Sequence, residues 1–275
     1  MQLHEKKFEF IQHIIPTQTK FNFRELPFVA FEQYYTTSNG TVILDPVSEV
    51  RDLGVTVTPN LSWTTHIQRI AKKASQAASW ILSVFRQRDH HTMLTLYKSL
   101  VRSHLEYCCP LWNPHNQSNN IKCLENVQRT FTSKITGYKD MNYWDRIASL
   151  KLMSLQRRRE RYIIIYMWKI KEGLVPNAID INWHFNERSR IRAQVPSIPK
   201  SKSRLQVFDS SFSVIGPRLW NIIPATCTVS PTLESFKANL QGFLDTIPDL
   251  PPVGNYVSKN NNSLLDWAMD GGRHC

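Results

Sequence analysis

The fold class follows from residues 62–87, which read SWTTHIQRIAKKASQAASWILSVFRQ. Apolar residues recur every three or four positions along this stretch, as they do on the buried face of a helix. They are Ile67, Ile70, Ala71, Ala74, Ala78, Ile81, Leu82 and Phe85. Serine and threonine at the start of the stretch can cap such a helix. The opposite, polar face carries three cations, Arg69, Lys72 and Lys73.

The same helical period continues downstream of this stretch. It predicts further helices over about 90–105, 118–136, 143–150, 154–173 and 232–245. Upstream, Asn39-Gly40 is a strong turn pair, and Leu53, Val55 and Val57 alternate with small or polar residues, which predicts a β-hairpin within 42–58. We therefore expect a mainly α fold, a helical bundle with a small β-hairpin near the N-terminus.

Composition and period divide the chain into four expected parts. Residues 1–60 contain the hairpin, and residues 61–175 form the helical domain. Residues 176–250 are a basic, Pro-rich region with a closing helix. Six basic residues and no acidic ones lie between Arg188 and Arg204, which indicates an extended run that repels itself unless an anion is present. Residues 251–275 are polar and Asn-rich, and we expect a disordered tail.

The charge balance points toward polyanions. Among 275 residues, 34 are Lys or Arg and 22 are Asp or Glu, a formal net charge of +12. Such a balance favours RNA or DNA as a partner, although a solvated basic surface is the alternative. Five irregularly spaced cysteines indicate reduced thiols, so we expect an intracellular, cytoplasmic or nuclear protein that is not secreted. No apolar run approaches the roughly 20 residues of a membrane span, so no membrane association is expected.

The residues of a catalytic or metal site are missing from the sequence. A polymerase needs carboxylates that hold two divalent metals, usually as a close pair in sequence. None of the 11 aspartates is adjacent to another or separated from another by one residue. His104, Cys108, Cys109 and His115 could be offered as a zinc site, but buried packing is the favoured interpretation. We expect no catalytic residue, no cofactor and no small-molecule substrate.

A second basic cluster begins at residue 157. Arg157, Arg158, Arg159 and Arg161 lie within five residues of a predicted helix and cannot all face a core. Arginine offers a planar fork of donors that suits phosphate oxygens, so several of these side chains are candidates for nucleic-acid binding. The alternative is a solvated helical turn whose arginines pair internally with Glu160.

A series of short motifs resembles the C-terminal part of jockey-like non-LTR retrotransposon reverse transcriptases. Each motif is weak alone, but their order and spacing over residues 5–250 make the set specific. The motifs are Val50–Val55, Leu61–Trp63 with His66-Ile67, Leu96–Arg102, Leu105–Cys108, Leu111–Pro114, Leu124–Arg129, Tyr143–Ile147, Leu152–Tyr162, Gly216–Asn221 with Ile223-Pro224, and Phe236-Lys237.

The resemblance implies a fragment of this RNA-directed DNA polymerase family. It implies that residues 1–60 are the end of the palm with a primer-grip-like hairpin, and that residues 61–175 are a thumb-like domain. The catalytic aspartates that bind Mg²⁺ in the family would lie upstream of this chain, so the chain alone is expected to be inactive. A thumb holds RNA or an RNA/DNA hybrid through contacts with the nucleic-acid backbone. Arg69, Lys72 and Lys73 are therefore the first candidates for nucleic-acid binding. The alternatives are an inert relic of a retroelement and a gene-model truncation of an active polymerase.

Overall fold

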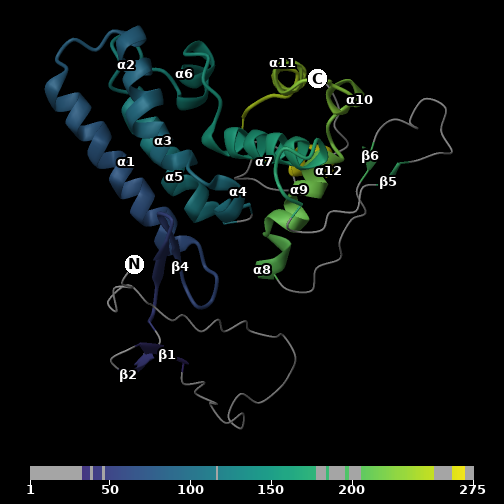
Figure 1. Ribbon diagram of the computed structural model, residues 1–275. Coiled ribbons are helices and arrows are strands. Elements are labelled where there is room, and N and C mark those ends of the chain that lie inside the picture. Colours follow the sequence, from purple (N-terminus) through teal and green to yellow (C-terminus); the bar gives the residue numbers. More distant parts are fainter. Residues whose placement is uncertain are drawn as a thin grey trace. The chain divides into compact units, whose positions relative to one another are not determined.

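The computed structural model describes residues 33–37, 40–44, 47–115, 117–177, 184–185, 196–197, 206–250 and 262–269. Over these residues the chain is mainly helical, with short antiparallel strand pairs, as the period predicted (Figure 1). The chain divides into two compact units, residues 1–66 and 67–275, which are described separately below. Most of the basic run at 188–204 and the opening residues 1–32 lie outside the described residues.

The described residues of the first unit form two hairpins, where the pattern predicted one. Strand β1 (Gln33–Thr37) pairs with β2 (Gly40–Leu44), and β3 (Val50–Asp52) pairs with β4 (Val55–Val57). Leu53 and Gly54, which join β3 to β4, have φ values of 44° and 89°. A tight two-residue hairpin turn needs positive φ at both positions, so the glycine is suited to this turn while the leucine is held in an unfavourable region.

The N-terminal half of the second unit follows the predicted helices closely. Helix α1 spans Thr64–Val84. The helix predicted over 90–105 is formed by three consecutive helical segments, α2 (His90–Leu96), the π-helical turn η2 (Tyr97–Val101) and α3 (Arg102–Glu106). Helices α5 (Ser118–Thr132), α6 (Tyr143–Ser149) and α7 (Leu155–Lys171) match the next three predictions. The short α4 (Cys109–Trp112) was not predicted.

The C-terminal half contains more helices than the single closing helix that we expected from its Pro-rich sequence. Helix α11 (Leu233–Asp245) matches the predicted closing helix, and it begins with a capping box between Thr232 and Ser235. Four short helices were missed by the sequence pattern. They are α8 (Gln206–Asp209), α9 (Phe212–Trp220), α10 (Ala225–Thr228) and α12 (Leu264–Met269). Strands β5 (His184–Phe185) and β6 (Pro196–Ser197) form a two-residue pairing.

Helix α7 is the central element of the second unit. Its apolar side chains, among them Ile164 and Trp168, share one buried cluster with α9, α11 and α12, and its other contacts are with α3, α4 and α5. Gly216 lets α9 approach α7 closely, because a Cβ there would lie 2.7 Å from the Sδ of Met167. Trp168 and Phe236 stack with ring centroids 5.4 Å apart, which joins α7 to α11.

The expectation of a disordered tail is wrong for residues 262–269. Leu264 is fully buried in the cluster around α7, and the Trp267 ring packs against Phe243 of α11. The polar, Asn-rich composition of the flanking sequence hid this short apolar segment, which is too brief to show a helical period.

Replacement of Leu264 by alanine tests this packing. We expect Leu264→Ala to lower the free energy of unfolding by about 2–5 kcal/mol, because it removes a fully buried side chain and leaves a cavity. Leu250→Ala makes the same chemical change at a side chain that is 46% exposed, and should cost within about 0.5 kcal/mol. Denaturant unfolding of the two variants measures the difference, and equal losses would show that α12 is not part of the core.

Candidate nucleic-acid interface

The solvent-facing side of α1 is positively charged. Arg69, Lys72 and Lys73 are exposed, as the sequence predicted, and α1 contains no Asp or Glu. Burial and the positive charge of Lys73 lower the pKa of His104 on α3. No acid of the helix itself therefore offsets its three cations. Phosphate binding by these residues stays a prediction.

Helix α5 lies beside α1 and also presents cations. Lys122 and Arg129 are exposed, and the only acid of α5, Glu125, is 5% exposed. The Arg129 guanidinium lies 4.6 Å from the centre of the Tyr143 ring and donates to the Oδ1 of Asn126 at 3.0 Å. These two contacts hold the Arg129 guanidinium between Asn126 of α5 and the Tyr143 ring of α6. Sequence reasoning missed Lys122 and Arg129 because they are isolated in the sequence.

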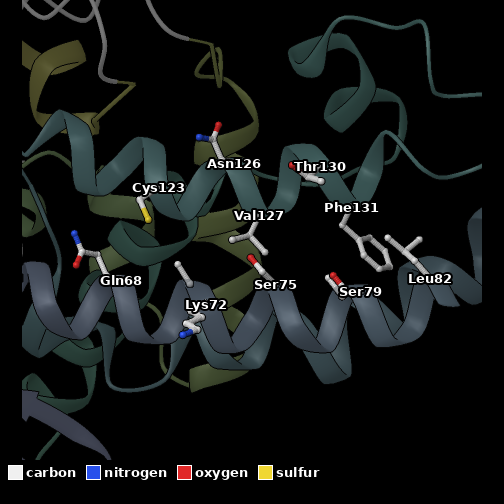
Figure 2. A pocket seen from close by; sticks show the side chains of 12 residues that line it. Gln68, Lys72, Ser75, Ser79, Leu82, Cys123, Asn126, Val127, Thr130 and Phe131 are labelled. Carbon is white, nitrogen blue, oxygen red and sulfur yellow. The ribbon is translucent and has the colours of Figure 1, made fainter. Parts of the chain in front are cut away.

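A groove of about 440 Å³ runs between α1 and α5 (Figure 2). Alanine and serine on the groove-facing side of α1 leave it open, since larger side chains at those positions would fill the space. Its lining combines apolar, hydroxyl and amide side chains with one cation and no acid. The lining residues are Gln68, Ala71, Lys72, Ser75, Ala78, Ser79, Leu82, Cys123, Asn126, Val127, Thr130 and Phe131.

The arginine run of α7 does not face solvent as the candidate assignment required. Arg157 is 2% exposed and Arg159 is 0% exposed. Arg157 donates from Nη2 to the carbonyl oxygens of Pro248 and Asn262, each at 3.2 Å. Arg159 donates from Nε to the Oδ1 of Asn113 at 3.0 Å. Neither guanidinium can reach a phosphate from this position, so both are corrected from candidate binding residues to internal ones.

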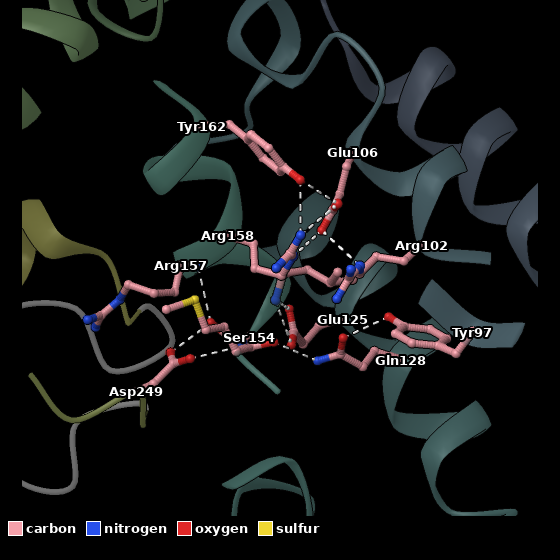
Figure 3. Close-up of polar contacts among 12 residues, drawn as sticks. Tyr97, Arg102, Glu106, Glu125, Gln128, Ser154, Arg157, Arg158, Tyr162 and Asp249 are labelled. Atoms are coloured by element: carbon pink, nitrogen blue, oxygen red, sulfur yellow. Dashed lines mark hydrogen bonds and ion pairs between the residues drawn. The ribbon is translucent and has the colours of Figure 1, made fainter. Parts of the chain in front are cut away.

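Arg158 is also engaged within the protein (Figure 3). Arg158 forms a bidentate ion pair with Glu106 of α3, in which Nη2 of Arg158 lies 3.0 Å from Oε2 of Glu106. The same Nη2 donates to the Tyr162 hydroxyl at 3.0 Å. Such forked pairs are among the stronger charge-assisted hydrogen bonds. Arg161 is partly exposed, and burial lowers the pKa of its guanidinium. Of the four arginines, Arg161 alone is neither buried nor held in an ion pair with a carboxylate in the described structure.

A buried carboxyl, that of Glu125, lies near Arg159 and interacts with it electrostatically. Glu125 accepts from the backbone N–H of Leu155 at 3.1 Å and from the Tyr143 hydroxyl, and burial raises the pKa of its carboxyl. The Tyr143 hydroxyl also accepts from the Gln128 amide, which in turn accepts from Tyr97 at 2.7 Å. The network therefore joins η2, α5, α6 and the start of α7, and its chemistry is structural.

A second polar cluster attaches the C-terminal segment to α7. Ser154, the N-cap of α7, donates to Asp249 and accepts from Asn262 at 2.8 Å. Glu160 accepts from the Ser263 hydroxyl at 2.5 Å and from the backbone N–H of Leu264 at 2.9 Å. These partners are about 100 residues from α7 in sequence, so no local pattern could have revealed them.

The remaining predictions about sites concern metals and membranes. In the described part of the chain, no three His, Cys, Asp or Glu side chains gather in a way that could hold a metal ion. Cys109 is buried as expected, but Cys108 is exposed, contrary to the expectation of buried packing. Among the described helices, none has the length and apolar character needed to cross a membrane.

Comparison with known proteins gives no match for this chain. No family model, curated protein or solved structure matched it. The assignment of a function therefore depends on the geometry above and on the sequence motifs.

The buried carboxyl of Glu160 predicts how stability depends on pH. Burial raises its pKa from 4.5 to about 7. A carboxyl that binds its proton more tightly in the folded chain stabilises the fold at low pH, and this contribution is lost as the pH rises from about 4.5 to about 7. We expect Glu160→Gln to flatten the fall in unfolding free energy between pH 5 and 7 by up to about 1.4 kcal/mol per pH unit.

Denaturant unfolding at several pH values measures this slope. Glu234→Gln removes an exposed carboxylate of α11 and serves as the control, since its slope should equal that of the unmodified protein. A Glu160→Gln variant with an unchanged slope would contradict the assignment.

Proposed function

We propose that this protein binds a polynucleotide through its sugar–phosphate backbone and does not polymerise it. The observation that carries the proposal is the acid-free, cationic face of α1, with Arg69, Lys72 and Lys73 exposed. Lys122 and Arg129, which are exposed on the neighbouring α5, add two further cations. Cations arranged along one face with no interspersed acid favour a ligand that carries many negative charges.

The groove edges add neutral donors to these charges. Serine, threonine, asparagine and glutamine side chains line it on both sides, and these residue types donate to phosphate and sugar oxygens in nucleic-acid complexes. Contacts of this kind set the position of the strand and carry no sequence information. We therefore expect binding that is independent of sequence and falls steeply with salt.

The motif series gives the proposal a more specific form. We propose that the chain corresponds to the thumb and C-terminal region of a jockey-like reverse transcriptase, that it is inactive alone, and that it holds RNA or an RNA/DNA hybrid in the cytoplasm or nucleus. The order of the motifs over residues 5–250 supports this. The motif Leu124–Arg129 lies on α5, beside the candidate interface, and Gly216–Asn221 covers the close α7–α9 contact.

Salt-dependent binding tests the proposal directly. Anisotropy of a labelled RNA/DNA hybrid hairpin, measured at several salt concentrations, gives the slope of log affinity against log salt. Replacing Lys72 and Lys73 together by glutamine should lower the magnitude of that slope by roughly 1.8, since each lost phosphate contact accounts for about 0.9 on a duplex.

The matched control removes the same two positive charges from a different part of the surface. Lys139 and Lys151 are exposed in the loops on either side of α6, and their double replacement by glutamine should leave the slope nearly unchanged. Equal effects of the two double variants would remove α1 from the interface. A monodisperse, helical sample that binds no hybrid at low salt would reject polynucleotide binding itself.

A further inference from the structure

The groove between α1 and α5 differs chemically from the cationic face beside it. Its lining includes Ala71, Ala78, Val127 and Phe131, which offer no hydrogen-bond donor to a phosphate. A phosphate placed against such a surface would lose its hydration without replacement, which is unfavourable. The groove therefore suits a part of the ligand that is largely apolar and uncharged.

The polar groups of the groove have a second property. Gln68 and Asn126 carry amides, and Ser75 carries a hydroxyl, so each can both donate and accept a hydrogen bond. The edges of nucleobases present donors and acceptors side by side. An apolar lining with a few such groups, in a volume within the roughly 300–1,000 Å³ of small-molecule pockets, matches a base better than a backbone.

Lys72 connects the groove to the cationic face. It is exposed on α1 and also lines the groove, so its ammonium can neutralise the phosphate of a nucleotide whose base enters the groove. Figure 2 shows Ser75 of α1 opposite Val127 of α5 at the middle of the groove.

We propose that the α1–α5 groove receives an unpaired base of the bound polynucleotide. This inference rests on the proposed polynucleotide binding and adds a preference for a ligand with a single-stranded end or loop. The competing location is Trp80, which is 58% exposed on the outer side of α1 and could stack a base on its own.

The test distinguishes binding of the bases from binding of the phosphates. Three labelled hybrid hairpins are compared: one blunt, one with a short single-stranded overhang, and one with an abasic overhang that carries the same phosphates. The protein should bind the overhang with bases about tenfold more tightly than the abasic overhang, as expected for one stacked base. Equal affinity for these two ligands would overturn the inference, while loss of binding to all three would reject polynucleotide binding as a whole.

Variants of neighbouring residues on α1 locate the base. Ser75→Trp places a large ring in the groove and should abolish the tenfold preference, measured as the ratio of its affinities for the overhang with bases and the abasic overhang. Gln76→Trp adds the same ring at the next, exposed position of α1 and should keep the preference. Retention of the preference in Ser75→Trp together with its loss in Trp80→Ala would move the base to Trp80 and overturn the groove assignment.

A measurement on the unmodified protein does not depend on how the variants fold. Cys123 lines the groove, whereas Cys108 is exposed outside it. The overhang with bases should slow alkylation of Cys123, read by mass spectrometry, and leave Cys108 unaffected, while the abasic overhang should protect neither. Unchanged alkylation of Cys123 under saturating ligand would overturn the inference.

Discussion

Charged groups that α7 carries into the interior constrain the second unit of this protein. Arg157, Arg159 and Glu160 of α7 are buried, and so is Glu125 of the neighbouring α5. A charge removed from water is tolerated only where hydrogen bonds and opposite charges replace its hydration. The carbonyls of Pro248 and Asn262, the side chain of Asn113 and the carboxyl of Glu125 provide such partners from other elements. The buried charges of α7 therefore depend on α5, on the residue that follows α4 and on the C-terminal segment.

This requirement divides the basic residues of the chain into two kinds. The arginines of α7 are held by specific partners and act within the fold, whereas the cations of α1 are exposed on a helix that has no acid. Arginine suits the internal task because its planar fork makes several hydrogen bonds at once, and lysine suits an exposed surface that meets phosphates as point charges. A net charge of +12 does not by itself distinguish these two roles.

Prediction from the sequence succeeded where one long apolar period decides the structure. Helices α1, α5, α7 and α11 have boundaries within a few residues of those expected, because each buries one stripe of side chains at helical spacing. It failed for α9, whose Gly216 and Pro217 are unfavourable inside a helix, and for α10, whose four residues are too few to show a period. It also failed for α12, whose helical structure accompanies the burial of Leu264 against distant residues.

The sequence by itself determined the helical class, the presence of a β-hairpin within 42–58 and the exposed cations of α1, because each depends on residues close together in the chain. Only the tertiary structure decided that Arg157 and Arg159 lie inside and that a groove opens between α1 and α5. The partners of the arginines are about 45 to 105 residues away, and the groove needs small side chains on one helix to meet a second helix. Local spacing contains no information on which distant groups will replace the water around a buried charge.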